Sequence, residues 1–225
     1  MHHSNKTFSL VVLDINVFDI NSKKIETMKL TKGIIAIIVV VVLGLIVFMY
    51  AKSLQNSMVG KEEGVTSQWA QVQNAYQRRA DLVPNLVATV KGYATHEQET
   101  LQAVVDARAK ATQMNVNADQ LTEENIKKYQ EAQGQLGAAL GRLLMVQENY
   151  PDLKANTNFL ALQDELTGTE NRISTERNKF NERVREYNTY IRMFPKNIFA
   201  GMFGFDKKGY FEADASAQSA PKVEF

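Results

Sequence analysis

Cysteine is absent from this 225-residue sequence, and histidine is scarce. Without cysteine the chain cannot form disulfides, Cys-ligated zinc sites, iron–sulfur clusters, thiol nucleophiles or an acylated lipoprotein anchor. Two of the three histidines are His2 and His3, which leaves His96 alone in the body of the chain. We therefore expect neither a histidine-based metal site nor a catalytic triad. The sequence predicts no cofactor and no metal.

A strong excess of either charge is also missing, with 26 Lys and Arg against 25 Asp and Glu. Nucleic-acid-binding proteins normally carry a basic face, so we expect no nucleic-acid partner. His96-Glu97 begins like a zinc-protease helix motif, but Thr100 stands where the second histidine would be. Asp164 and Glu165 are adjacent on a predicted helix, where their side chains diverge, so glycosidase geometry is unsupported. These features predict a protein that is not an enzyme.

One long hydrophobic run stands out, because residues 33–51 contain no charge and lie between Lys32 and Lys52. A helix of 19 residues spans about 28 Å, close to the thickness of a bilayer's hydrocarbon core. The run is longer than the apolar core of a signal peptide, and no A-x-A cleavage site follows it. Residues 33–51 are predicted to form an uncleaved transmembrane helix.

The lysines around this run predict its orientation. Four precede the span and two follow it: Lys23, Lys24, Lys29 and Lys32, then Lys52 and Lys61. Because positive residues stay on the cytoplasmic side, we expect a single-pass membrane protein. Its N-terminus would be cytoplasmic and residues 52–225 exported.

Residues 1–27 do not fit the rest of the chain. Residues 8–20 are apolar and partly alternating, like a strand with nothing to pair with. Met28 then opens a complete anchor start, with two lysines ahead of the apolar run. We interpret residues 1–27 as a non-native or disordered extension, with Met28 as the true start. The alternative is a functional cytoplasmic tail.

Helical periodicity dominates the exported part, which contains only Pro84 and Pro151 between residues 54 and 194. The clearest helix is predicted from about Asp152 to Phe194, ended by Pro195. Its apolar residues recur at heptad spacing and indicate a buried seam. They are Leu166, Ile173, Phe180, Tyr187 and Phe194, joined by Val184 and Ile191.

A second helix is predicted at about residues 119–149, with Tyr129, Leu136, Leu140, Leu143 and Tyr150 as its apolar positions. Small residues also gather on one of its faces: Gly134, Ala138 and Gly141. Such a face favours close approach of a neighbouring helix. A ligand-approach site is the alternative.

The first exported segment, about residues 56–113, carries a long apolar stripe interrupted by Pro84. Either the helix kinks and continues, because the stripe keeps its phase, or Asp81 caps a new helix. We favour the kink. A continuous helix would leave Trp69, Val72 and Tyr76 without an intrachain partner, which predicts self-association through them.

The fold class is therefore all-α. An N-terminal transmembrane helix is followed by an antiparallel bundle of three to four long helices at residues 54–205. The Ala/Ser-rich tail, residues 206–225, is predicted to be an extended strip anchored by Tyr210, Phe211, Val223 and Phe225.

Several motifs together resemble the LemA family. They are Gln77-Arg-Arg-Ala-Asp-Leu-Val-Pro-Asn-Leu-Val, Val90-Lys-Gly-Tyr-Ala-Thr-His-Glu, Tyr150-Pro-Asp-Leu-Lys-Ala-Asn-Thr-Asn-Phe, Thr169-Glu-Asn-Arg-Ile, and the Phe180-Asn, Tyr187-Asn, Ile191 and Phe194-Pro195 series. The likeness runs from about residue 56 to residue 225, and residues 1–27 lie outside it. The resemblance implies a bacterial single-pass protein, which we expect in the inner membrane, with a soluble helical bundle, and it brings no catalytic residues.

Two groups of candidate interaction or structural residues follow. Arg78, Arg79 and Asp81 lie beside Pro84 and Asn85, either as a recognition patch or as local caps around the proline. A polar row of the last helix, Ser174, Asn181 and Asn188, runs one step past the seam. Because Pro84 frees the carbonyl of Ala80, we expect Asn181 or Asn188 to bond main-chain oxygen near Ala80 or Asp81, or the side chain of Asn85. The alternative is that both asparagines face solvent.

Glu170 and Arg177 fall on the seam row itself. There they either pair with a charge on another helix or turn outward into water. Tyr187, Phe194 and Pro195 complete the candidate set as members of the family-like motifs.

These observations favour a membrane-anchored scaffold or interaction protein that docks other envelope proteins and is able to form homo-oligomers. The alternative is the ectodomain of a sensor, which would need a partner for its output because at most 32 residues precede the span.

Overall fold

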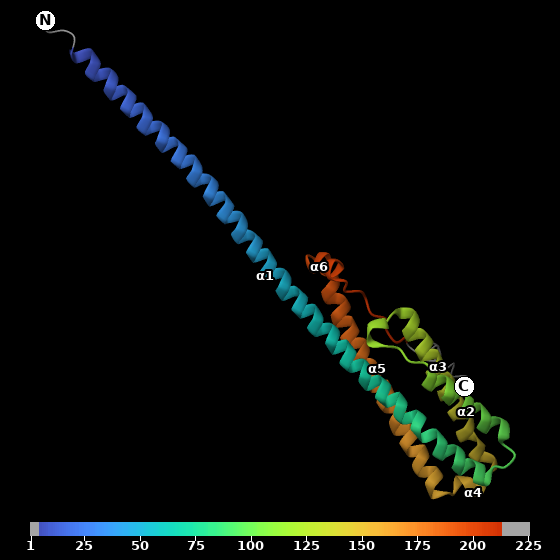
Figure 1. Ribbon diagram of the computed structural model, residues 1–225. Coiled ribbons are helices and arrows are strands. Elements are labelled where there is room, and N and C mark those ends of the chain that lie inside the picture. Colours follow the sequence, from blue (N-terminus) through green and yellow to red (C-terminus); the bar gives the residue numbers. More distant parts are fainter. Residues whose placement is uncertain (1–4, 213–225) are drawn as a thin grey trace, which may run out of the picture. The chain divides into compact units, whose positions relative to one another are not determined.

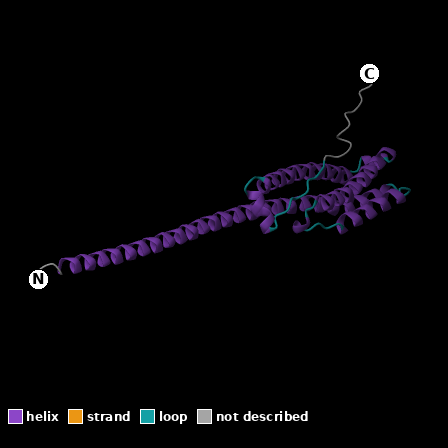
Figure 2. Ribbon diagram, turned by 90° about the horizontal axis from the view of Figure 1, so that it is seen from above, coloured by secondary structure: helices purple, strands orange, loops and turns teal. Residues whose placement is uncertain are grey.

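The computed structural model describes residues 5–212, with side chains from residue 31 onward. The described residues form helices and loops, with no strand among them (Figure 1, Figure 2). This confirms the all-α prediction. The helices are α1 (Asn5–Tyr93), α2 (Gln98–Gln113), α3 (Glu123–Met145), α4 (Pro151–Lys154), α5 (Thr157–Arg192) and α6 (Lys196–Phe203), with 3-10 turns at Ala118–Gln120 and Val146–Asn149.

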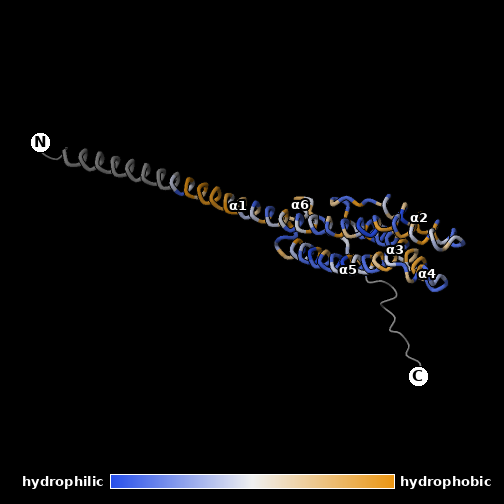
Figure 3. The backbone as a smooth tube through the Cα atoms, turned by 90° about the horizontal axis from the view of Figure 1, so that it is seen from below, coloured by the Kyte–Doolittle hydropathy of each residue, from blue (hydrophilic) through white to orange (hydrophobic). Residues whose placement is uncertain are grey.

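The chain divides into two units, Met1–Leu54 and Gln55–Phe225. In the first unit, residues 5–27 belong to α1 and do not form the strand that their alternation resembles, whereas their interpretation as a non-native extension stays a prediction. The apolar residues from Ile34 to Tyr50 are all exposed, and Figure 3 shows them as a continuous hydrophobic stretch of α1. Among the described residues, α1 is the one helix long and apolar enough to cross a membrane.

The second unit is a four-helix bundle whose neighbours alternate in direction. Arg108 of α2 bonds Ala80, and Trp69 bonds Val116 beyond the end of α2, so α2 runs antiparallel to α1. Gln68 of α1 bonds Glu176 of α5, whereas Arg78 bonds Glu165. Residue numbers therefore rise along α1 where they fall along α5, so these two helices are also antiparallel. This up-down-up-down arrangement is the one that short connections favour.

Apolar residues at helical spacing form the bundle core. One cluster joins residues of α1, α2, α3 and α5, and its fully buried members include Leu86, Val104, Leu136 and Phe159. The predicted seam of α5 is buried from Leu166 through Ile191. Phe194 is the exception, at 81% exposed, because α5 ends at Arg192. Phe194 precedes Pro195, and helical conformation is disfavoured for a residue that precedes a proline.

Side-chain caps set the starts of two predicted helices, α5 and α3. Asn156 accepts a hydrogen bond from the Phe159 amide at 2.9 Å, so α5 begins at Thr157 and Asp152 belongs to the short α4. Thr122 caps α3 at the Asn125 amide, which leaves Asp119 in a 3-10 turn. The first segment is also two helices, since α1 ends at Tyr93 and α2 follows the loop at residues 94–97.

Pro84 lies inside α1, which confirms that the helix continues through it. The self-association expected from a continuous helix is not supported at the residues we named. Trp69, Val72 and Tyr76 are at most 4% exposed within this chain, because α3, α5 and the tail cover them. These three residues are therefore not available as contacts for a second copy.

The carbonyl freed by Pro84 does have a donor, and it is Arg108. The Nε of Arg108 donates to the Ala80 oxygen at 2.8 Å. Asn181 and Asn188, which we expected in this role, bond the tail instead. Arg108 comes from the neighbouring helix α2, whose register the sequence pattern did not reveal.

We expect the Arg108→Met substitution to lower the unfolding free energy by about 1–3 kcal/mol, because the buried Ala80 oxygen loses its donor. With Pro84→Ala already present, the new amide at position 84 satisfies that oxygen, and Arg108→Met should cost less. Urea unfolding of the four proteins in a double-mutant cycle measures the coupling. Additive losses would show that Arg108 does not serve the proline site.

A short helix that the sequence did not predict follows Pro195. α6 ends at Gly204, whose φ of 76° provides the left-handed C-cap that glycine adopts without strain. The chain from residue 205 to residue 212 is then extended. This agrees with the predicted tail, of which Val223 and Phe225 lie outside the described residues.

Candidate functional site

The extended tail lies across side chains of α3 and α5. We call residues 206–212 the tail segment. The residues whose side chains hydrogen-bond its backbone form the tail-binding face: Gln130, Arg177, Asn181, Tyr187 and Asn188. On α5, Asn181 and Asn188 are seven residues apart and Arg177 is four residues before Asn181, so these three side chains share one face of the helix.

Two asparagines of α5 each form two hydrogen bonds with the tail backbone, one donated by the amide nitrogen and one accepted by the amide oxygen. Asn181 donates to the Phe211 carbonyl and accepts from the Phe211 amide, both at 2.9 Å. Asn188 donates to the Lys208 carbonyl at 2.9 Å and accepts from the Lys208 amide at 3.0 Å. Side-chain amides carry a donor and an acceptor side by side, so they pair with a peptide unit as a neighbouring strand would.

Gln130 of α3 repeats this pairing at Glu212, with distances of 3.1 and 3.2 Å to its carbonyl and amide. Arg177 also donates to the Glu212 carbonyl at 2.9 Å. At the other end of the tail segment, the Tyr187 hydroxyl donates to the Asp206 carbonyl at 3.0 Å. Recognition is thus directed mainly at the backbone of the tail.

Gly209 lies where the tail comes closest to α3. A Cβ at this position would stand 2.6 Å from the Glu123 Cα and 2.7 Å from its nitrogen. The Gly209 amide donates to the Leu121 carbonyl at 2.8 Å. Both obstructing atoms are backbone, so only glycine fits without displacing the tail.

An aromatic cluster lies beneath the tail segment. Phe211 is 4% exposed, and its ring stacks on Trp69 at 5.9 Å and meets Phe180 edge-on at 5.5 Å. Trp69 also contacts Tyr129 at 5.0 Å, and its indole N–H donates to the Val116 carbonyl at 2.9 Å. The tail therefore supplies part of the bundle core.

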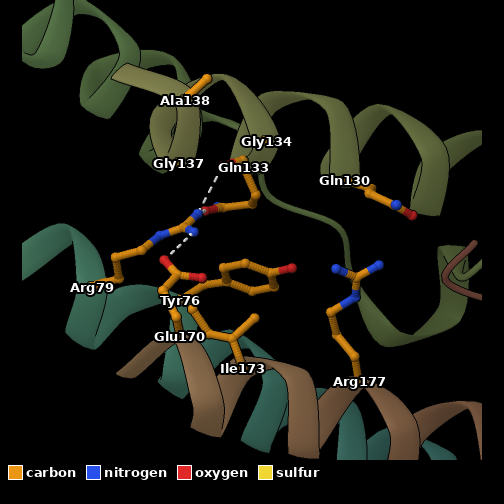
Figure 4. Close-up of a pocket in the computed structure, with 10 residues that line it drawn as sticks. All are labelled: Tyr76, Arg79, Gln130, Gln133, Gly134, Gly137, Ala138, Glu170, Ile173 and Arg177. Atoms are coloured by element: carbon orange, nitrogen blue, oxygen red, sulfur yellow. Dashed lines mark hydrogen bonds and ion pairs between the residues drawn. The ribbon is translucent and has the colours of Figure 1, made fainter. Parts of the chain in front are cut away.

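A polar pocket of about 380 Å³ adjoins this face between α1, α3 and α5 (Figure 4). Gln130 and Arg177 belong to both the pocket and the tail-binding face. Gly134, Gly137 and Ala138 line one wall, and a Cβ on Gly134 would meet nothing within 4 Å. The small residues of α3 thus open a cavity, and the expected close helix packing at this face is wrong.

Arg79 is the buried charge of the pocket, with 3% of its surface exposed. Its guanidinium reaches from α1 to Glu170 of α5 at 2.7 Å and to the carbonyl and side-chain oxygen of Gln133 on α3, both at 2.8 Å (Figure 4). The Nε has no partner in the described structure. Glu170 therefore pairs with an arginine of another helix, one of the two outcomes we expected for it.

The groups around this region whose pKa is shifted keep their usual protonation state at neutral pH. Burial raises the pKa of Tyr129, and burial likewise raises the pKa of Tyr187. The hydrogen bond from Gln68 lowers the pKa of the Glu176 carboxyl. Both tyrosines remain neutral hydrogen-bonding groups and Glu176 stays ionised, which is the behaviour of structural groups. Among the residues the structure describes, no cluster of three or more His, Asp or Glu side chains is able to hold a metal.

The candidates around Pro84 separate into two sides of α1. Arg78 pairs with Glu165 at 2.8 Å on the surface, and Asp81 accepts from Gln77 within its own helix. Pro84 and Asn85 are exposed. Arg79 faces the bundle interior, so it cannot share a surface patch with its neighbours.

Three of the other candidates belong to the tail-binding face: Asn181, Tyr187 and Asn188. Phe194 and Pro195 do not, because they lie at the turn between α5 and α6. Sequence reasoning missed Gln130, Gln133 and Gly209. Gly209 did carry a signal, since a lone glycine beside two aromatic residues in a tail marks a close approach.

The chain matches the LemA family over residues 68–225, more than two thirds of its length. Magnetosome protein MamQ 1 of Paramagnetospirillum magneticum is 26% identical over 195 residues, which cover 79% of this chain and 72% of the relative. Protein LemA of Metamycoplasma hominis is 24% identical over 174 residues, which cover 77% and 75%. The tail-binding face and the polar pocket both lie within the matched range, and this chain belongs to the LemA family.

Proposed function

We propose that this protein is a membrane-anchored, non-enzymatic interaction protein of the bacterial envelope. Its bundle docks extended segments of other envelope proteins on the tail-binding face. The observation that carries the proposal is the amide pairing of Asn181, Asn188 and Gln130 with the backbone of the tail segment.

Backbone pairing suits a docking protein, because it accepts many sequences in one extended conformation. Specificity then comes from the side-chain positions that the face covers, of which the Phe211 site above Trp69 is the most apolar. The tail segment is the resident occupant of this face. A partner must displace it, so the tail sets a threshold for docking.

A membrane location supports the same function. The apolar stretch of α1 is long enough to span a bilayer, and the MamQ relatives are named as magnetosome proteins. We place the protein as a single-pass protein of the inner membrane with the bundle exported. The excess of lysines ahead of the span supports this orientation.

Protease added to spheroplasts tests the orientation. We expect digestion of the bundle beyond Lys52 while the membrane is intact. Survival of the bundle until the membrane is breached would reverse the orientation and remove exported partners from the proposal.

Docking is tested by capturing crosslinked proteins from native membranes with three full-length variants. Gly209→Ala releases the tail, so we expect it to capture more partner protein than the wild type. Adding Asn181→Leu should reverse this gain by about tenfold, because a two-bond amide pairing is worth about 1.4 kcal/mol. Adding Asn178→Leu is the matched control, since Asn178 is exposed on the same helix. Equal capture by the two double variants would contradict docking on this face.

A sensor ectodomain acting through a membrane partner is the second candidate function. The pocket favours it, because two arginines, Arg79 and Arg177, line a cavity large enough for a small anion. Native mass spectrometry of the purified full chain would show a bound small anion that Arg177→Gln releases. Under the interaction proposal, no such ligand accompanies the protein and Arg177→Gln changes only tail binding.

A further inference from the structure

A group of large apolar side chains remains exposed where α5 ends and α6 begins. Phe194 is 81% exposed, Met202 72% and Ile198 53%, and Met193 at 50% lies beside Phe194 in the chain. Ile198 and Met202 are four residues apart in α6, so they share one helix face. We call these four residues the α6 patch. Elsewhere in the bundle, the large apolar residues that are exposed are scattered along the helices.

The α6 patch lies at the end of the bundle from which the chain leads to the apolar run. Tyr190, near the end of α5, has its ring 5.4 Å from the Lys61 Nζ and 3.7 Å from the Lys196 Nζ. Ten residues separate Lys61 from Ala51, where the apolar run ends. Ten residues of chain reach at most about 36 Å, whatever their conformation. The length of this segment therefore keeps the α6 end of the bundle within reach of the bilayer surface.

Positive charge accompanies the patch. Arg192 precedes it and is exposed, and Lys196 lies within it, with its ammonium group over the Tyr190 ring. An apolar helix face bordered by Lys and Arg is typical of segments that lie in the headgroup region of a membrane. Anionic lipid headgroups attract such cations over short distances.

We propose that the α6 patch inserts into the lipid surface of the leaflet at which the membrane span ends. The bundle would then contact the bilayer twice, through the span and through α6. Phe194, Ile198 and Met202 are the inserted residues, at a depth of about 5–10 Å below the surface. This contact is independent of the docking function proposed for the tail-binding face.

The cysteine-free sequence allows a direct test on the full-length chain in vesicles of phosphatidylethanolamine and phosphatidylglycerol. Ile198→Cys, Met202→Cys and Leu160→Cys each receive a nitroxide spin label. Leu160 is the matched control, because it is also apolar and exposed, at 43%, but lies near the start of α5. All three side chains are exposed, so the substitutions leave the core intact.

We then compare how often each label collides with oxygen, which enters lipid, and with a nickel chelate, which stays in water. We expect labels at positions 198 and 202 to meet oxygen and to be shielded from the chelate at least about tenfold relative to position 160, since apolar burial disfavours the aqueous reagent. If 198 and 202 meet the chelate as readily as 160, α6 is not inserted. Shielding from both reagents would indicate burial in a protein contact and would equally overturn the lipid proposal.

Discussion

Replacing Trp69 with alanine is expected to lower the unfolding free energy by about 3–5 kcal/mol, as for other buried aromatic truncations. Trp69 is 2% exposed, and its ring contacts Tyr129, Phe180 and Phe211 from three different elements. The substitution also leaves the Val116 carbonyl without its indole donor. Folded domains are stable by only about 5–15 kcal/mol, so this loss is a large fraction of the total.

Urea unfolding of the detergent-solubilised chain, followed by far-UV circular dichroism, measures this loss. Trp69→Phe is the matched variant, because it keeps a ring in the cluster and removes the N–H donor. We expect it to cost about 1–2 kcal/mol. A loss below about 1 kcal/mol for Trp69→Ala would show that the aromatic cluster does not stabilise the bundle.

Gly209→Ala is expected to release the tail segment while leaving the helices in place. The new methyl group would stand 2.6 Å from the Glu123 Cα, and a backbone atom cannot move aside as a flexible side chain can. Overpacking of this kind costs about 1–3 kcal/mol. A cost of about 2 kcal/mol raises the population of released tail about 30-fold.

Amide hydrogen exchange reads out this release. The amides of Lys208, Gly209, Phe211 and Glu212 each donate to the bundle, so they should exchange slowly in the wild type and faster in Gly209→Ala. Gly168→Ala is the control, and we expect it to raise stability where Gly209→Ala lowers it. Gly168 lies exposed in α5 with open space around it, so alanine should stabilise the helix by about 0.5–1 kcal/mol. Unchanged exchange in Gly209→Ala would show that the tail tolerates a side chain at this position.

Periodicity in the sequence was sufficient to predict the long helical segments of the bundle and their buried faces, but not the break between α1 and α2 or the short α6. The α5 seam from Leu166 to Ile191 is buried as its heptad spacing indicates. Helix ends were predicted less well, because a cap such as Asn156 looks like an ordinary loop residue until its bond to the Phe159 amide is known. Continuity through Pro84 was predicted because the apolar stripe keeps its phase there.

The candidate site was only half predictable, for a physical reason. The row of Asn181 and Asn188 stood out, since polar residues beside a buried seam need partners. Their partners are backbone groups of the tail, and every residue carries the same backbone groups. The sequence therefore suggested that Asn181 and Asn188 bind backbone, and it could not show which segment they bind.

The small face of α3 illustrates the same limit. Gly134 and Ala138 are compatible with either close helix packing or an open wall, and the spacing of the helices decides between them. Arg79 extends from α1 to Gln133 and Glu170, and the pocket lies beside this contact. Its partner Gln133 was missed because a single glutamine on a polar helix carries no distinctive pattern.

The central claim is that the tail-binding face docks extended segments of other envelope proteins, and site-specific photo-crosslinking tests it most directly. A photoreactive phenylalanine derivative replaces Gln130, which contacts Glu212 of the tail, and the control position is Lys128, exposed two residues earlier on α3. In cells, the wild-type background should crosslink position 130 to the tail of its own chain. In the Gly209→Ala background, the crosslink should move to an extended segment of another envelope protein, with none at position 128. Crosslinks at position 130 that reach only this chain or a second copy of it, in both backgrounds, would contradict the claim.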